Sequence, residues 1–151
     1  MTKSVYYCAL FVAFGLVVAT ALCRPALLAD NPFLVGFVNH ELINTMCVIA
    51  TITLASTAQI HLAFNSIEER FKKRGLTATR AGVRQAAYWL IALLGGSVVL
   101  VTVRPAQGQH EVFSAFCNGM ALFILFWSVL ILLSITRLVF AIHPIFDEKK
   151  E

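Results

Sequence analysis

The chain has 151 residues, of which 59% are hydrophobic and only 13% are charged, and its mean hydropathy is +0.80. A soluble domain of ordinary composition carries roughly 25% charged residues. A soluble fold could not cover this much apolar surface, so the composition excludes a soluble globular protein and predicts an integral membrane protein.

Four apolar stretches are long enough to cross a bilayer. A span needs about 20 apolar residues, because the hydrocarbon core is about 30 Å thick and a helix rises about 1.5 Å per residue. Lipid offers no partner to an open backbone group, and strong β-barrel alternation is absent, so the spans should be helices. We predict an all-α four-helix bundle in one domain over residues 1–151, with spans at about 5–23, 33–64, 79–103 and 112–142.

The first stretch also has features of a secretory signal. Lys3 precedes it, and the Ala19, Thr20, Ala21 triplet resembles a cleavage site. An uncleaved segment of this length is a span, and we interpret it as the first transmembrane helix.

The basic residues are distributed unevenly between the two sides of these spans. Of the twelve Lys and Arg, only Arg24 and Arg104 fall on one side. The other side carries Lys3, Arg70, Lys72, Lys73, Arg74, Arg80, Arg84, Arg137, Lys149 and Lys150. The positive-inside rule therefore predicts that both termini and the middle loop are cytoplasmic, and we expect the inner (plasma) membrane of a bacterium.

The formal charge of +4 comes mainly from the middle loop and is no indication of nucleic-acid binding. Two interpretations stay open for this loop: the charges serve only to orient the helices, or they contact anionic lipid and a cytoplasmic protein partner. The candidate contact residues are Arg70, Lys72, Lys73, Arg74, Arg80 and Arg84.

The second helix is expected to be long. Asn31 before Pro32 is a good N-cap followed by a good first helical residue, and Gly75 is a natural terminator. No proline lies between Pro32 and Gly75, so one continuous helix is possible, with a cytoplasmic extension to about residue 74.

This extension has an apolar face that needs a cover. The stripe consists of Ile60, Phe64, Ile67 and Phe71, at spacings of four, three and four. We expect the start of the third helix to pack back on it through Val83 and Ala87, and the alternative is a protein partner.

The most polar group near a span is Asn39, His40, Glu41 and Asn44 on the second helix. On a continuous helix, His40 and Asn44 share a face, whereas His40 and Glu41 point about 100° apart. Ionisable groups inside a membrane suggest function, because their burial is costly. Three interpretations stay open: ordinary interfacial residues, a contact between helices or subunits, and a pore mouth or proton-linked site.

Farther along, the second helix is the least hydrophobic of the four spans. Its polar residues are Thr51, Thr53, Ser56, Thr57 and Gln59. We expect this helix to face protein or water, in a central position within the bundle.

No residue pattern typical of catalysis or of cofactor binding is present. The four cysteines, Cys8, Cys23, Cys47 and Cys117, lack metal-ligand spacing and should behave as small apolar residues. A haem held by His61 and His143 has only weak support, because histidines near helix ends usually reach for the interface. We expect neither an enzyme nor a cofactor.

The pattern therefore favours a non-enzymatic, oligomeric subunit that anchors or senses at the membrane and engages a cytoplasmic partner. The alternative is a pore or membrane-permeabilising effector, holin-like or defence-type, in which the second helix lines the conduit. A secondary transporter comes third, because no inverted repeat or broken helix is evident. Membrane lipids and a second copy of the chain are the expected partners, and nucleic acid is not.

Overall fold

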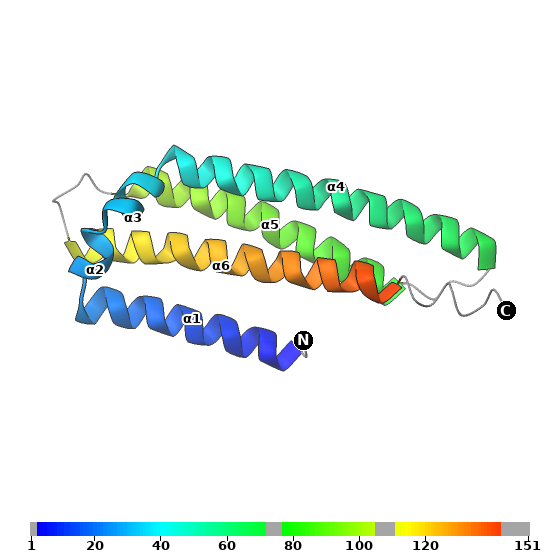
Figure 1. Cartoon of the computed structure of the whole chain (residues 1–151), viewed down its shortest axis with the longest axis horizontal. Coiled ribbons are helices and arrows are strands. Elements are labelled where there is room, and N and C mark those ends of the chain that lie inside the picture. Colours follow the sequence, from blue (N-terminus) through cyan, green and yellow to red (C-terminus); the bar gives the residue numbers. More distant parts are fainter. Residues whose placement is uncertain (1–2, 72–76, 105–110, 143–151) are drawn as a thin grey trace.

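The structure is a computed structural model that describes residues 3–71, 77–104 and 111–142. These residues form helices and no strand (Figure 1). The helices are α1 (Lys3–Cys23), α2 (Ala26–Ala29), α3 (Pro32–Phe37), α4 (His40–Phe71), α5 (Thr77–Val103) and α6 (Glu111–Ile142). The prediction of an all-α chain is confirmed for this part of the protein.

Four of these helices are long and apolar enough to cross a membrane. The candidate spans are Ser4–Cys23, His40–Ser66, Arg80–Val103 and Glu111–Leu138, and His40–Ser66 is the least apolar of them. We call the end of the molecule that carries α2 and α3 the α2–α3 end. The opposite end, where α4 ends and α5 begins, is the hairpin end (Figure 1).

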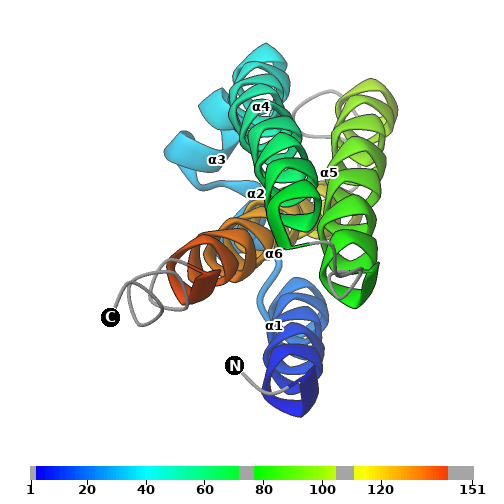
Figure 2. The same cartoon turned by 90° about the vertical axis from the view of Figure 1, so that its right-hand side faces the viewer.

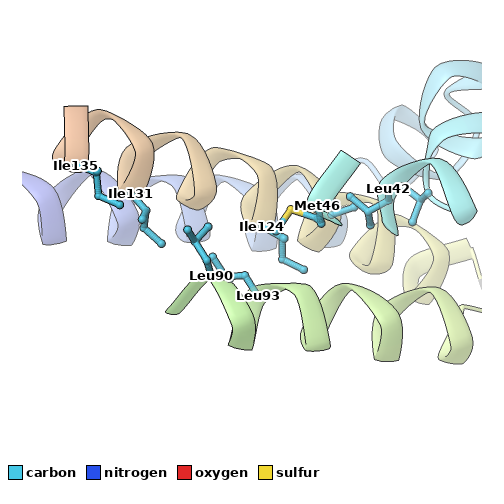
Figure 3. Packing of buried hydrophobic residues seen from close by; sticks show 9 residues of the cluster. Leu42, Met46, Leu90, Leu93, Ile124, Ile131 and Ile135 are labelled. Carbon is cyan, nitrogen blue, oxygen red and sulfur yellow. The ribbon is translucent and has the colours of Figure 1, made fainter. Parts of the chain in front are cut away.

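The main core lies where α4, α5 and α6 meet. Leu42 and Met46 on α4 and Leu90 on α5 are fully buried, and they pack with Ile124 and Ile131 of α6 (Figure 3). The hydroxyl of Ser128 on α6 donates to the sulfur of Met46 at 3.4 Å and to the carbonyl of Ile124 at 2.8 Å. Shape-complementary packing holds these helices together, since lipid tails are as apolar as the side chains.

The central helix is α6, and the expectation that the second span would be central is wrong. In the most apolar stretch of α6, 44% of the residues are buried, against 24% for α4. In Figure 2, α6 lies between α1 and α4. The reason is residue size: α6 presents Ser114, Ala115, Gly119 and Ala121 to its neighbours, and such small residues allow close approach.

The first helix packs mainly on α6 and on the short α2, rather than closing the bundle against α4. A side chain added at Gly119 of α6 would put its Cβ 2.6 Å from Cγ1 of Val17. A second buried cluster joins Ala21 of α1, Ala29 of α2 and Ala115 of α6. α1 is therefore attached to one side of a three-helix core.

The connection between the first two spans contains a break that the sequence interpretation did not include. Asn31 does cap α3, and its side-chain oxygen accepts from the backbone N–H groups of Phe33 and Leu34. The continuous helix expected from Pro32 is wrong, however, because α3 ends at Phe37 and α4 begins at His40. Gly36 and Asn39 both disfavour a helix interior, which accounts for the interruption.

At the hairpin end, α4 runs beyond its apolar span to Phe71, and its last turns reach past the ends of α5 and α6 (Figure 1). Phe64 and Val83 are both buried where α4 packs on α5. The Arg80 guanidinium also donates to the side-chain oxygen of Asn65 at 2.7 Å. This agrees with the expected intramolecular cover, while the side chains of Ile67 and Phe71 lie outside the described residues.

The close contact at Gly119 leads to the first prediction. Gly119→Ala should lower the free energy of unfolding by about 1–3 kcal/mol, because the new methyl group meets a branched side chain that has little rotamer freedom in a helix. Thermal unfolding of the protein in detergent would measure this.

Gly15→Ala on α1 is the matched control, because a Cβ at Gly15 meets no atom within 4 Å. We expect Gly15→Ala to unfold no earlier than the original chain. Equal unfolding temperatures for the two variants would contradict the proposed packing of α1 on α6.

Candidate functional site

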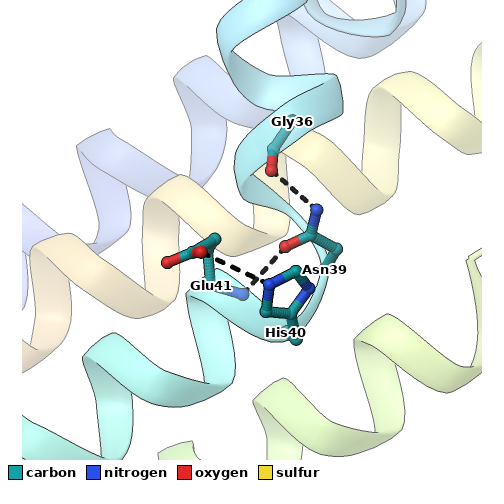
Figure 4. A network of polar contacts seen from close by, with 4 residues as sticks. All are labelled: Gly36, Asn39, His40 and Glu41. Carbon is teal, nitrogen blue, oxygen red and sulfur yellow. Dashed lines mark hydrogen bonds and ion pairs between the residues drawn. The ribbon is translucent and has the colours of Figure 1, made fainter.

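The polar residues predicted as a site lie at the junction of α3 and α4 (Figure 4). The side-chain amide of Asn39 donates to the carbonyl of Gly36 at 2.7 Å, and its oxygen accepts from the backbone N–H of Glu41 at 2.8 Å. One side chain thus serves the last turn of α3 and the first turn of α4. Asn39 acts as the N-cap of α4.

His40 and Glu41 form a pair on the surface. Nε2 of His40 lies 3.3 Å from Oε1 of Glu41, and the two side chains are 75% and 57% exposed. Successive positions of a helix are about 100° apart, yet the tips of these two side chains meet, because His40 is the first residue of α4 and no earlier turn of that helix lies beside it. Glu41, in the first turn, is also well placed to interact with the positive end of the helix dipole.

Asn44 lies one turn farther along α4 and is exposed. It makes no hydrogen bond to another residue of the described part of the chain. The structure therefore brings Asn39, His40 and Glu41 together and leaves Asn44 on a separate stretch of helix surface.

Arg104 completes the junction, and the sequence interpretation missed this role. Its guanidinium Nη1 donates to the carbonyl of Val35 at 3.2 Å and also to the carbonyl of Val38. Burial lowers the pKa of Arg104 from its ordinary value, but an arginine in a protein stays charged. A signal was available: Arg104 directly follows the apolar run of the third span, on the side where the chain has only one other basic residue, Arg24.

Asn118 is a second polar residue that was overlooked. It is fully buried on α6, and its side-chain amide donates to the carbonyl of Leu28 on α2 at 2.6 Å. Its side-chain oxygen has no partner among the described residues. As the only amide side chain within residues 111–142, it could have been noticed from the sequence.

An aromatic group joins three helices in the half of the bundle nearer the hairpin end. Nε1 of Trp127 on α6 donates to the hydroxyl of Tyr6 on α1 at 2.8 Å. The ring of Trp127 also lies 5.1 Å from that of Trp89 on α5 and 5.7 Å from that of Phe123. The spacing of these residues along the chain gave no indication that they would meet.

The predicted basic loop is described only in part. Arg80 is half-buried and bound to Asn65, so it serves the α4–α5 contact, whereas Arg84 is exposed. Lys72, Lys73 and Arg74 lie outside the described residues, as does the side chain of Arg70.

The cysteines and histidines, which are the remaining candidate ligands, do not form a site among the described residues. Cys8, Cys23 and Cys47 are exposed, Cys117 is buried, and all four are free thiols. Within residues 3–71, 77–104 and 111–142, no three His, Cys, Asp or Glu side chains gather as metal ligands. His61 is half-buried on α4, and His143 lies outside the described residues.

No family model matches the chain, and no curated protein or solved structure is significantly similar to it. Its function has to be inferred from the geometry. At the α2–α3 end, that geometry consists of caps and backbone hydrogen bonds.

The second prediction separates a capping role from a functional role at this junction. Asn39→Ala should cost about 1 kcal/mol of stability through loss of the N-cap. It should also increase hydrogen exchange at the backbone amide of Glu41. Arg104→Gln should cost about 1.5–3 kcal/mol, because hydrogen bonds from a charged donor are lost.

Two controls at the same junction are His40→Ala and Glu41→Gln, which change exposed side chains. His40→Ala should unfold at the original temperature in detergent, and Glu41→Gln should cost no more than about 0.3–1 kcal/mol, the dipole interaction of an exposed charge. Loss of stability from either control equal to that of Arg104→Gln would contradict the capping role.

Proposed function

We propose that this chain is a non-enzymatic subunit of the inner (plasma) membrane that assembles through α4 into an oligomer. Within that assembly it anchors or senses at the membrane and engages a cytoplasmic partner through the hairpin end. The polar residues on the exposed face of α4 are the observation that carries this proposal.

The orientation in this proposal rests on charge. Ten of the twelve Lys and Arg fall, in the sequence, on the side of the two termini and of the loop between the second and third spans, which the positive-inside rule assigns to the cytoplasm. The three tyrosines and two tryptophans of the chain, Tyr6, Tyr7, Tyr88, Trp89 and Trp127, occur in the first turns of α1, the first half of α5 and the second half of α6. Tyr6 and Tyr7 lie near the end of a candidate span, as expected for residues that favour a membrane interface, whereas Trp89 and Trp127 lie deeper. Such residues favour both interfaces, so they do not decide the orientation.

One face of α4 is exposed along its whole span. It carries Asn44, Cys47, Thr51, Ala55 and Gln59, at spacings of three or four residues. These residues are small or polar, and none of them is buried in the core of the chain. Small residues let a second helix approach closely, and amides can hydrogen-bond across such a contact.

Gln59 is the residue least suited to lipid. It lies seven residues inside the end of the span at Ser66, a depth of about 10 Å at 1.5 Å per residue. Its amide makes no hydrogen bond to a described residue. A polar group in hydrocarbon without a partner costs free energy, and the same face of a second α4 would supply one.

The third prediction concerns this amide. Gln59→Leu should weaken self-association about fivefold, the change that corresponds to roughly 1 kcal/mol for one interhelical hydrogen bond. Mass measurement over a range of protein-to-detergent ratios would show it. Thr102→Val is the control, because Thr102 is exposed on α5 and its hydroxyl donates to the carbonyl of Val98 in its own helix.

Cys47 allows a direct test of the same face. A variant that keeps only Cys47, with Cys8→Ser, Cys23→Ser and Cys117→Ala, should form a disulfide-linked dimer under mild oxidation in nanodiscs. A variant that keeps only Cys8 on α1 should not. A monomeric mass both in detergent and in nanodiscs, without cross-linking, would contradict assembly through α4.

The alternative function is a pore, and the same polar face favours it. In a ring of copies, Asn44, Thr51 and Gln59 could line a shared axis instead of a helix contact. Purified protein in liposomes should then release ions without a partner, and Gln59→Leu should reduce that release. An anchoring subunit should release none, and should retain a cytoplasmic protein that is lost when Arg70, Lys72, Lys73, Arg74 and Arg84 are neutralised together.

A further inference from the structure

A pocket of about 330 Å³ opens between α1, α5 and α6 in the half of the bundle nearer the hairpin end. Its walls include Tyr6 and Tyr7 from α1, Gln85 and Trp89 from α5, and Trp127 from α6. It exists because α1 packs on α6 and does not close against α5. Its lining combines aromatic rings with hydroxyl and amide groups.

An apolar trough of about 390 Å³ continues from this pocket along α5 and α6. Trp127 lines both, and the trough then passes Ala92 and Gly96 of α5 and Phe123 of α6. A side chain at Gly96 would meet no atom within 4 Å, so the trough is open there. The trough goes on past Gly96 to Val103 of α5 and Phe113 of α6. Pocket and trough together extend from Gln85 to Val103, eighteen residues or about 27 Å along the helix, and the part from Gln85 to Gly96 is about 16 Å, roughly half of a 30 Å hydrocarbon core.

A cationic side chain lies beside the pocket, in a neighbouring depression. Ser134 of α6 lines the pocket and also a neighbouring depression that contains Arg137. Arg137 is exposed and makes no ion pair with a described residue. The Tyr6 hydroxyl accepts from Trp127, while its own hydrogen is donated to no described residue.

We propose that this pocket and trough bind one anionic phospholipid of the cytoplasmic leaflet. An acyl chain lies past Trp89 and Trp127 as far as Gly96, and the phosphate group lies by Tyr6, Ser134 and Arg137. The proposal rests on membrane insertion and orientation as given above, but not on assembly through α4.

The charge at one end favours a lipid over a second copy of the chain. The groove is long enough for a transmembrane helix, but an apolar helix would give Arg137 and the hydroxyl hydrogen of Tyr6 no anionic partner. An acyl chain with an anionic head group fits the part of the groove from Gln85 to Gly96, and its head group meets these donors. An arginine near the membrane surface also adds attraction for anionic lipid.

The two tryptophans of the chain both line the pocket, so they report on its contents. The full chain is reconstituted in phosphatidylcholine vesicles that contain a minor fraction of phosphatidylglycerol brominated on its acyl chains. Bromine quenches tryptophan fluorescence on contact. We expect quenching about fivefold stronger than with the same fraction of brominated phosphatidylcholine.

Two pairs of variants test the two ends of the site. Gly96→Leu fills the trough and should lower quenching by phosphatidylglycerol to the phosphatidylcholine level, whereas Gly95→Leu, which does not line the trough, should leave it unchanged. Arg137→Gln should lower the preference for phosphatidylglycerol about fivefold, the factor that corresponds to roughly 1 kcal/mol for one basic residue. Arg84→Gln changes an exposed arginine that lines neither the pocket nor the neighbouring depression, and it should preserve the preference.

Equal quenching by the two lipids would overturn the proposal, as would equal effects of Arg137→Gln and Arg84→Gln. Tryptophans that neither lipid quenches, in a protein that is dimeric in nanodiscs, would show that a second copy covers the groove instead. Gln59 lies on α4 and lines neither the pocket nor the trough. If Gln59→Leu abolishes assembly but leaves quenching unchanged, the lipid site is supported independently of assembly through α4.

Discussion

The connection between α1 and α4 depends on one requirement: the backbone N–H and C=O groups that lose their hydrogen bonds where a helix ends must form new ones. The chain interrupts its helices near Pro25, Asp30 and Val38, in the connection between the first two candidate spans. The side chains of Asn31 and Asn39 accept hydrogen bonds from backbone N–H groups at the starts of α3 and α4. Arg104 donates to backbone carbonyls of α3 and of Val38 just after it. These three side chains, with Asn118 on the carbonyl of Leu28, allow a compact turn where a continuous helix would otherwise project.

That turn sets the position of α1. Because α2 packs on α6 through Leu28 and Asn118, α1 enters the bundle on the side of α6 away from α4. α6 then carries neighbours on both sides, and its small residues allow each to approach closely. Two consequences follow for function: an open groove remains between α1 and α5, and the polar face of α4 stays uncovered within one copy of the chain.

These two surfaces differ in what they can accept. The face of α4 has small side chains and unpaired amides along a full span, which suits another helix. The groove beside α5 is apolar and has an arginine in a depression next to one end, which suits an anionic lipid. A subunit with both features could couple its assembly to the lipid around it, since α5 separates the two surfaces and packs on α4 and α6 alike.

Local features of the sequence determined the parts of this protein that depend on one segment at a time. Apolar run length determined the four membrane-length helices, Asn31 before Pro32 determined the start of α3, and the stripe through Phe64 indicated that the α4–α5 hairpin needs a cover. The tertiary structure decided what requires two distant segments. It placed α6 at the centre in place of the second span, used Arg104 to hold the ends of α3, and brought Tyr6, Trp89 and Trp127 together. Hydrophobic length measures the transfer of a segment into lipid, whereas the choice of neighbours depends on residue shape across helix contacts, which no single segment contains.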